Sequence, residues 1–155
     1  MAESGSSVVQ PDVRTREGRA KLMGRLPKFS DLSPDDVDAL AGQALVRQLG
    51  AGVDLYLDGA VADSFAIVVM GTISKRGVVN KRPLGPNTVV GTLPLLRRNE
   101  RLRRRTAGLM SLSPVMLIEI PYRALDLLPS ERREAFLDSI AEEALTLIER
   151  LEHAS

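Results

Sequence analysis

The sequence predicts a mainly β domain with flanking helices, and three observations support this fold class. Between residues 44 and 120, short β-forming runs are separated by turn residues at intervals of roughly eight to twelve positions. Helical patterns stand on both sides of this region. The chain has 155 residues, 44% of them hydrophobic and 26% charged, which suits one globular domain. Many short strands with this spacing favour an antiparallel sandwich or jelly roll.

The N-terminal part contains one firm helix signal. Residues 1–26 are expected to form a flexible tail, within which residues 16–26 can make a short basic helix. Ser33 then supplies the side chain of a good N-cap, and Pro34 suits the first helical position. Two aspartates follow and complement the helix dipole. We therefore expect a helix that begins at Pro34 and ends near Gly42.

Eight strands are expected in the β region, between about residues 44 and 120. Glycine, proline, asparagine and aspartate mark the breaks between the strands, because these residues adopt turn conformations readily. The expected strands are 44–49, 54–57, 64–70, 71–75, 78–82, 88–90, 106–111 and 115–120.

Two helices are expected at the C-terminal end. The first covers residues 122–128 and stops at Pro129, and the second covers about 130–153 with Ser130 as its cap. The longer helix carries an apolar stripe at spacings of three and four, formed by Leu137, Ile140, Ala141, Ala144, Leu147, Ile148 and Leu151. Such a stripe covers either the rest of the domain or a helix of a partner, and both alternatives are open.

Positive charge is concentrated in one segment. Residues 97–105 contain six arginines and one glutamate, whereas the whole chain has a formal net charge of +1. Gly91 precedes this segment, so a glycine turn, free backbone N–H groups and several guanidinium groups come together in the sequence. That combination predicts an anion-binding loop. The alternative is a solvated basic loop without a ligand.

Composition argues against several functions. No cysteine is present, so disulfides and thiolate metal sites are excluded. The only histidine, His153, falls near a helix end, and no Walker-type phosphate loop occurs, so we expect neither an enzyme nor a metal site. Three Phe, two Tyr and no Trp, with the low net charge, argue against nucleic-acid binding. No run of 18 apolar residues and no signal-peptide core occur, so we expect a cytoplasmic protein without membrane contact.

Four segments carry motifs in a specific order. They are a hairpin at residues 50–60, a strand pair at 62–73, a glycine turn at 84–91, and a loop formed by 93–96 with 106–107. Together they resemble the cyclic-nucleotide-binding domain of the catabolite activator and protein kinase regulatory subunit type. The resemblance covers about residues 29–151. It implies an eight-stranded antiparallel β-roll of the jelly-roll type, with an N-terminal helix and two C-terminal helices.

The resemblance also implies domain boundaries. The domain is expected at residues 27–153, with the roll at about 44–120 and the C-terminal helices at about 122–153. The family's transcription factors carry a helix-turn-helix after the long helix, and no such DNA-binding domain is expected here.

The same resemblance implies a divergent phosphate-binding cassette. In ligand-binding members, a Glu accepts the ribose hydroxyl and an Arg pairs with the cyclic phosphate. The Glu position matches Thr92 here, and the Arg position matches Arg103 when counted back from Thr106, with Arg104 and Arg105 as alternatives. The expected ligand-binding residues are Gly91, Thr92, Leu93, Arg103, Arg104, Arg105 and Thr106, and the expected apolar wall is Leu84, Val89 and Leu95.

Two functions follow from these expectations. The first is a non-enzymatic regulatory domain without a cofactor. It binds cyclic AMP, cyclic GMP or cyclic di-GMP at residues 91–106 and signals through the C-terminal helix. The second is a degenerate domain that binds no nucleotide and acts as a protein-interaction or dimerisation module. Its interaction helix presents Leu137, Ile140, Ala144, Leu147, Ile148 and Leu151 to a partner or to a second copy.

Overall fold

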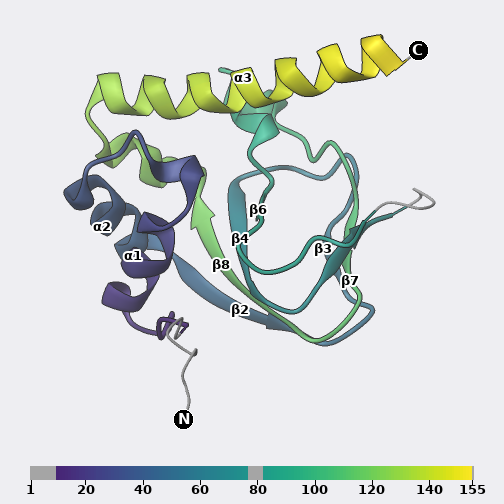
Figure 1. The fold of residues 1–155 in the computed structure, drawn as a ribbon, viewed down its shortest axis with the longest axis horizontal. Helices are drawn as coiled ribbons and strands as arrows, with labels where there is room; N and C mark the ends of the chain where they lie inside the picture. Colours follow the sequence, from purple (N-terminus) through teal and green to yellow (C-terminus); the bar gives the residue numbers. More distant parts are fainter. Residues whose placement is uncertain (1–9, 77–81, 155) are drawn as a thin grey trace.

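Two antiparallel sheets curve around each other to form a roll in the computed structural model, which describes residues 10–76 and 82–154 (Figure 1). The four-stranded sheet has the order β2 (Leu45–Leu49), β8 (Val115–Pro121), β4 (Ser64–Met70) and β6 (Val89–Val90). The three-stranded sheet has the order β3 (Asp54–Tyr56), β7 (Leu109–Ser111) and β5 (Ile73–Lys75).

The predicted β-roll is confirmed, with a difference in the number of strands. The seven described strands correspond to seven of the eight expected ones. The remaining expected strand, 78–82, falls almost wholly on residues outside the described part of the chain. Every strand pair is antiparallel, and the longest pairing joins β4 to β8, with Phe65 opposite Ile120.

Strand β4 divides the hydrophobic core into two clusters. Phe65 and Ile67 pack in the cluster shared with the helices, whereas Ala66 and Val68 pack in the cluster inside the roll. Alternate side chains of a strand point to opposite faces, so a strand between two clusters is apolar on both faces. This placement explains why the segment SFAIVVM lacks the polar alternation of a half-exposed strand.

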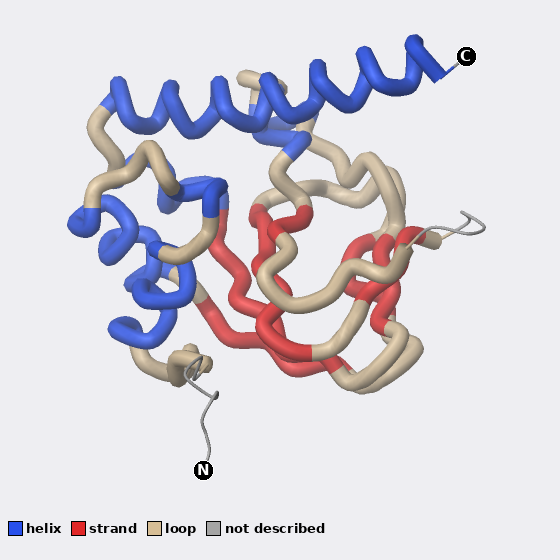
Figure 2. Tube along the Cα trace, in the orientation of Figure 1, coloured by secondary structure: helices blue, strands red, loops and turns tan. Residues whose placement is uncertain are grey.

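Helices cover one side of the roll, shown in blue in Figure 2. They are α1 (Arg16–Gly24), the short 3₁₀ helix η1 (Pro27–Phe29) and α2 (Pro34–Gln43). The predicted cap of α2 is confirmed. The Ser33 hydroxyl accepts from the Asp36 N–H, and the Asp36 carboxylate accepts from the Ser33 N–H, so both groups form a capping box.

Residues 10–26 belong to the packed domain, which differs from the flexible tail expected for residues 1–26. The side chains of Val13, Leu22 and Met23 are buried in the same cluster as those of α2. Arg19 also donates from Nε to the carbonyl of Ala41 at 2.8 Å. The short basic helix that residues 16–26 can make is present as α1, and the burial of its few apolar side chains against α2 stabilises it.

The C-terminal helices lie across one end of the molecule (Figure 1). The first expected helix is a 3₁₀ helix, η4 (Tyr122–Leu127), and the second is α3 (Ser130–Ala154). The expected interaction stripe divides between two environments. Ile140 is buried and Leu137 and Ala144 are half-buried, whereas Leu147, Ile148 and Leu151 are exposed. In the described part of the chain, none of the helices is both long and apolar enough to cross a membrane.

Candidate functional site

A cavity of about 280 Å³ opens in the roll beside the turn that precedes the basic segment. We call it the Arg105 cavity. Its polar lining consists of Lys75, Thr88, Thr92, Arg105 and Thr106. The other lining residues are Tyr56, Leu84, Val89, Val90, Gly91, Leu93, Pro94, Ala107 and Leu109. The cavity therefore combines apolar walls with a cationic polar part, as small-molecule sites commonly do.

Gly91 forms the turn at the edge of this cavity. Its φ angle is +86°, a conformation that residues with a Cβ rarely adopt. A Cβ added at Gly91 would lie 3.0 Å from Nη1 of Arg105 and 3.0 Å from the Tyr56 hydroxyl. The Tyr122 hydroxyl donates to the carbonyl of Gly91. Both conformation and space therefore require glycine here, and the turn is tied to the start of η4.

Arg105 is the buried cation of the cavity, with 6% of its surface exposed. Its Nη1 donates to the carbonyl of Ser64 at 2.6 Å, and its Nη2 donates to the Ser64 hydroxyl at 3.2 Å. The guanidinium carbon lies 3.5 Å from the centroid of the Tyr56 ring. These contacts hold the guanidinium group in one orientation, with a cation–π interaction on one face.

No carboxylate among the described residues forms a hydrogen bond with Arg105. Asp63 Oδ1 lies 3.9 Å from Nη2, and the Asp63 side chain is 86% exposed. Glu119 acts only through Ser64, whose hydroxyl donates to it at 2.9 Å, and it also pairs with Arg47 at 2.8 Å. The positive charge of Arg105 is therefore buried with indirect compensation, an arrangement that favours an added anion.

Two tyrosines, the only ones in the sequence, contact this guanidinium group. The Tyr56 hydroxyl is buried near Ser64 without a well-formed hydrogen bond among the described residues. Burial raises the pKa of Tyr56, although the charge of Arg105 opposes the rise. Burial likewise raises the pKa of Tyr122 to about 12. Both phenols are thus neutral at physiological pH.

The buried arginine is Arg105, one of the two alternatives to Arg103, which the resemblance matched first. Residues 103–105 pair with 60–62: the Arg105 N–H donates to the carbonyl of Ala60 at 2.7 Å, and the Ala62 N–H donates to that of Arg103 at 3.0 Å. Arg103 lies over the Tyr122 ring, with 5.5 Å from its guanidinium carbon to the centroid. Arg104 is exposed. Neither side chain lines the Arg105 cavity.

Most of the other expected site residues line the Arg105 cavity, and one does not. Gly91, Thr92, Leu93 and Thr106 line the cavity, as do Leu84 and Val89 of the expected apolar wall. Leu95 does not, because it is buried in the core cluster beneath α3. Among the described residues, no group of three or more His, Asp or Glu side chains is placed to hold a metal ion.

Known proteins are similar to this chain in structure, although no protein-family model and no curated protein matches its sequence. A cyclic nucleotide-binding-like protein from Brucella abortus is 25% identical, with a TM-score of 0.58 over 70% of this chain and 94% of that one. The regulatory domain of Toxoplasma gondii protein kinase A with cAMP is 12% identical, with a TM-score of 0.67 over 83% and 51%. The regulatory subunit of a cAMP-independent protein kinase A from Trypanosoma brucei is 17% identical, with a TM-score of 0.69 over 86% and 47%. This chain has the cyclic-nucleotide-binding domain fold.

The chain spans about half the length of these two kinase proteins and nearly all of the Brucella protein. Within the cyclic-nucleotide-binding fold, the Arg105 cavity lies at the segments whose sequence resembles the phosphate-binding cassette. These structural similarities confirm the prediction that the chain has the cyclic-nucleotide-binding domain fold.

Sequence reasoning missed Tyr56 and Lys75 as lining residues of the cavity. The signal for Lys75 was present, because Lys75 is two positions from Ile73 in a strand and so shares its inward face. For Tyr56 a weaker signal existed in composition. Aromatic residues are scarce in this chain, and both tyrosines gather at one arginine.

Proposed function

We propose that this protein is a non-enzymatic regulatory domain that binds a phosphorylated nucleotide messenger in the Arg105 cavity. The observation that carries the proposal is the buried guanidinium group of Arg105, which lacks a hydrogen-bonded carboxylate among the described residues. A phosphate supplies the missing negative charge, and it matches the paired donors of a guanidinium group. Similarity to a regulatory domain that holds cAMP favours a nucleotide. The proposed messengers are cyclic AMP, cyclic GMP or cyclic di-GMP, and the proposed location of the protein is the cytoplasm.

The proposed signal passes from the cavity to α3 through two connections. Thr92 and Leu93 line the cavity and lead directly into the 3₁₀ helix η2 (Leu93–Leu96). Leu95 of η2 is buried in the same cluster as Phe136 of α3. Tyr122 joins the Gly91 turn to η4, which precedes α3. A ligand that prefers one position of the turn and η2 would therefore shift the population of α3 positions.

Isothermal titration calorimetry on the full chain tests the binding. We expect heat from at least one of cyclic AMP, cyclic GMP and cyclic di-GMP. Arg105→Ala should weaken that binding at least about tenfold, because a charged hydrogen-bonded pair is lost. Arg104→Ala is the matched control, since it removes the same charge from the adjacent exposed position. Its affinity should equal that of the wild type.

Circular dichroism must show that the Arg105→Ala protein is folded. If it is not, Arg105→Lys replaces it, because lysine keeps the charge but loses the paired donors. A folded wild type that gives no heat with any of the three nucleotides contradicts the proposal, as does an equal loss of affinity in Arg104→Ala.

A second candidate function is self-association through α3, which the exposed end of the helix favours. Leu147 is 55% exposed and Leu151 is 64% exposed, and Leu145 and Ile148 are exposed beside them. Four large apolar side chains on one exposed helix segment are unusual for a monomer surface. We propose that a second copy of this chain covers them with the same segment, in an arrangement with two-fold symmetry.

Light scattering at high protein concentration tests the dimer. We expect the wild type to be dimeric and the double variant Leu147→Asp with Leu151→Asp to be monomeric, because two carboxylates on each copy would be buried in the interface. Leu112→Asp is the control, since it places an acid at an exposed leucine outside α3. A monomeric wild type rules out this second function.

A further inference from the structure

The Arg105 cavity has an unbalanced charge. Of the fourteen lining residues that the structure describes, Lys75 and Arg105 are cationic, and none is an aspartate or glutamate. Its remaining polar groups are the hydroxyls of Thr88, Thr92, Thr106 and Tyr56. Hydroxyls and cations both donate hydrogen bonds, so the polar part of the cavity offers an anion many donors and no competing carboxylate.

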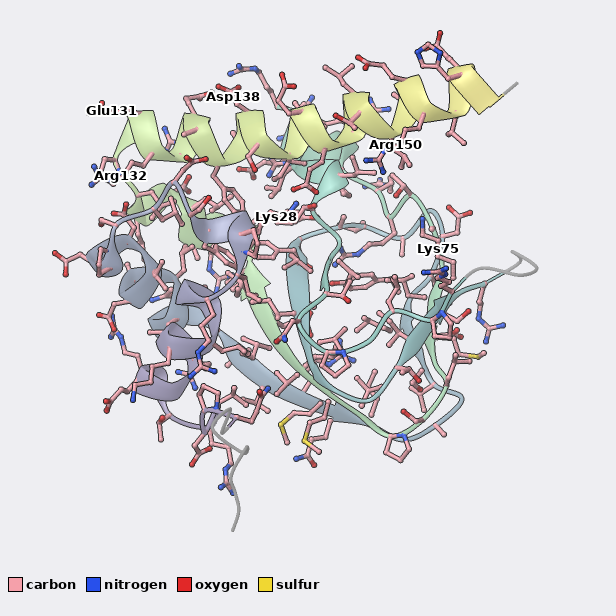
Figure 3. All side chains as sticks on the ribbon, viewed as in Figure 1. Lys28, Lys75, Glu131, Arg132, Asp138 and Arg150 are labelled. Carbon is pink, nitrogen blue, oxygen red and sulfur yellow. The ribbon has the colours of Figure 1, made fainter. Side chains whose placement is uncertain are left out.

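Lys75 faces the cavity because of its position in β5. It shares a strand face with Ile73, which is fully buried. It also stands opposite Leu109 in the β5–β7 pairing, and Leu109 is buried and lines the cavity. Figure 3 labels Lys75, whose half-buried side chain lies at the edge of the roll. A lysine on an inward strand face is uncommon without a partner for its charge.

The nearby carboxylates do not neutralise these two cations. Asp54 forms an ion pair with Arg76, and Glu119 pairs with Arg47. Asp63 lies 3.9 Å from Arg105, but its side chain is 86% exposed, so water screens most of its charge. The tyrosines stay neutral because burial raises their pKa values. Among the described residues, Lys75 therefore has no carboxylate partner, and Arg105 has only a 3.9 Å contact with the exposed Asp63 and an indirect link to Glu119.

A ligand with two negative charges fits this cavity better than one with a single charge. A cyclic mononucleotide carries one negative charge on its phosphodiester. A terminal phosphate monoester carries nearly two at neutral pH, because its second pKa is about 6. The volume of about 280 Å³ lies near the lower end of the range for small-molecule sites, which favours a mononucleotide over a dinucleotide.

We propose that the Arg105 cavity selects a nucleotide 5′-phosphate dianion over the corresponding cyclic monophosphate, with Arg105 and Lys75 sharing the phosphate charge. The selection rests on the proposed function, since it needs a nucleotide to bind in this cavity. Lys75 is the residue that determines specificity, because Arg105 alone matches a monoanion.

Calorimetry with AMP, GMP, cyclic AMP, cyclic GMP and cyclic di-GMP tests the selection. At about pH 7.5, AMP or GMP should bind at least about tenfold more tightly than its cyclic counterpart. Lys75→Gln should remove this advantage while cyclic nucleotide affinity changes little. Lys21→Gln, which removes the charge of an exposed lysine in α1, should keep the wild-type ratio.

The pH dependence gives a second readout. At about pH 5 the monoester holds mainly one negative charge, so its advantage over the cyclic nucleotide should shrink towards unity. The charged and titratable groups that line the cavity are Lys75, Arg105 and Tyr56, and Asp63, Glu119 and Tyr122 lie near Arg105. No imidazole is among them, since the single histidine is His153 at the end of α3.

The outcomes separate this inference from the proposed function. Equal or tighter binding of the cyclic mononucleotide overturns the selection and leaves the proposed function standing. The tightest binding by cyclic di-GMP, or an advantage that persists in Lys75→Gln or at about pH 5, also overturns it. Absence of heat from every nucleotide with folded protein contradicts both proposals together.

Discussion

Replacing Phe136 with alanine should lower the free energy of unfolding by about 3–5 kcal/mol. The Phe136 side chain is almost fully buried, and its ring centroid lies 5.8 Å from that of Phe29 and 5.9 Å from that of Phe65. The variant loses the transfer energy of a benzyl group and leaves a cavity between three elements that cannot fully collapse. Urea denaturation followed by circular dichroism measures the loss.

The control for this variant lies on the same helix. Glu142→Ala should change the free energy of unfolding by no more than about 0.5 kcal/mol, because Glu142 is exposed and lies outside the proposed dimer segment. If Phe136→Ala lowers the free energy of unfolding by less than about 1 kcal/mol, the Phe136 ring does not hold α3 against the roll.

The three phenylalanines of the sequence all belong to this one cluster. Phe29 comes from η1, Phe65 from β4 and Phe136 from α3, so the cluster joins the helices to the roll. Phe65 also stacks against Tyr122, with 6.4 Å between centroids, and Tyr122 contacts Arg105 and Gly91. The packing that docks α3 is thus continuous with the Arg105 cavity.

Features set by local sequence could be predicted. The Ser33 cap depends on residues within one helical turn, and β4 depends on an apolar run that the chain shows directly. The fold followed from several weak motifs in a fixed order, although each alone would not decide it. These local patterns were sufficient to predict the fold and the segment that lines the cavity.

The identity of the buried arginine could not be read from local sequence. Residues 103–105 are three consecutive arginines with the same intrinsic properties. Their separate environments come from pairing with residues 60–62, more than forty positions away. Successive side chains along this pairing point in opposite directions, so the three arginines do not share one environment. A motif count starting from Thr106 selected Arg103, with Arg104 and Arg105 as alternatives, and the pairing with residues 60–62 places Arg105 in the cavity.

Burial of α1 was missed for a related reason. Its sequence has few apolar residues and weak helical periodicity, so composition favoured a flexible tail. The helix is fixed by Leu22 and Met23 against α2, and by Arg19, which reaches the carbonyl of Ala41 at the end of that helix. Such tertiary contacts override local propensity, and they are invisible without the partner element.

Asp36→Asn should lower the free energy of unfolding by about 2 kcal/mol at neutral pH. The Asp36 carboxylate is buried, receives the Ser33 N–H at 3.0 Å and forms an ion pair with Arg132 at the start of α3, which Figure 3 labels. Removing one partner of a buried pair costs about 3–5 kcal/mol. Because Arg132 is 39% exposed, water can solvate it in the variant, which reduces the cost.

The stability that the Asp36 carboxylate contributes should decrease at acidic pH. Burial opposes ionisation of Asp36, but hydrogen bonds from the Ser33 N–H and from Arg132, with the charge of Arg132, outweigh it, so the pKa lies below the ordinary value of 3.8. A carboxylate with a lowered folded-state pKa stabilises the fold above its unfolded pKa of about 3.9. That contribution is lost as the pH falls through the folded-state pKa.

Urea denaturation of both proteins between about pH 7 and pH 2.5 measures this dependence. The difference between wild type and Asp36→Asn should be constant above about pH 5 and should shrink below about pH 4. Asp38→Asn is the matched control, because Asp38 lies on the same helix and its ion pair with Arg16 is exposed. Its loss should be below about 1 kcal/mol. A difference for Asp36→Asn that grows as the pH falls would show that burial, not the Arg132 pair, determines the ionisation of Asp36.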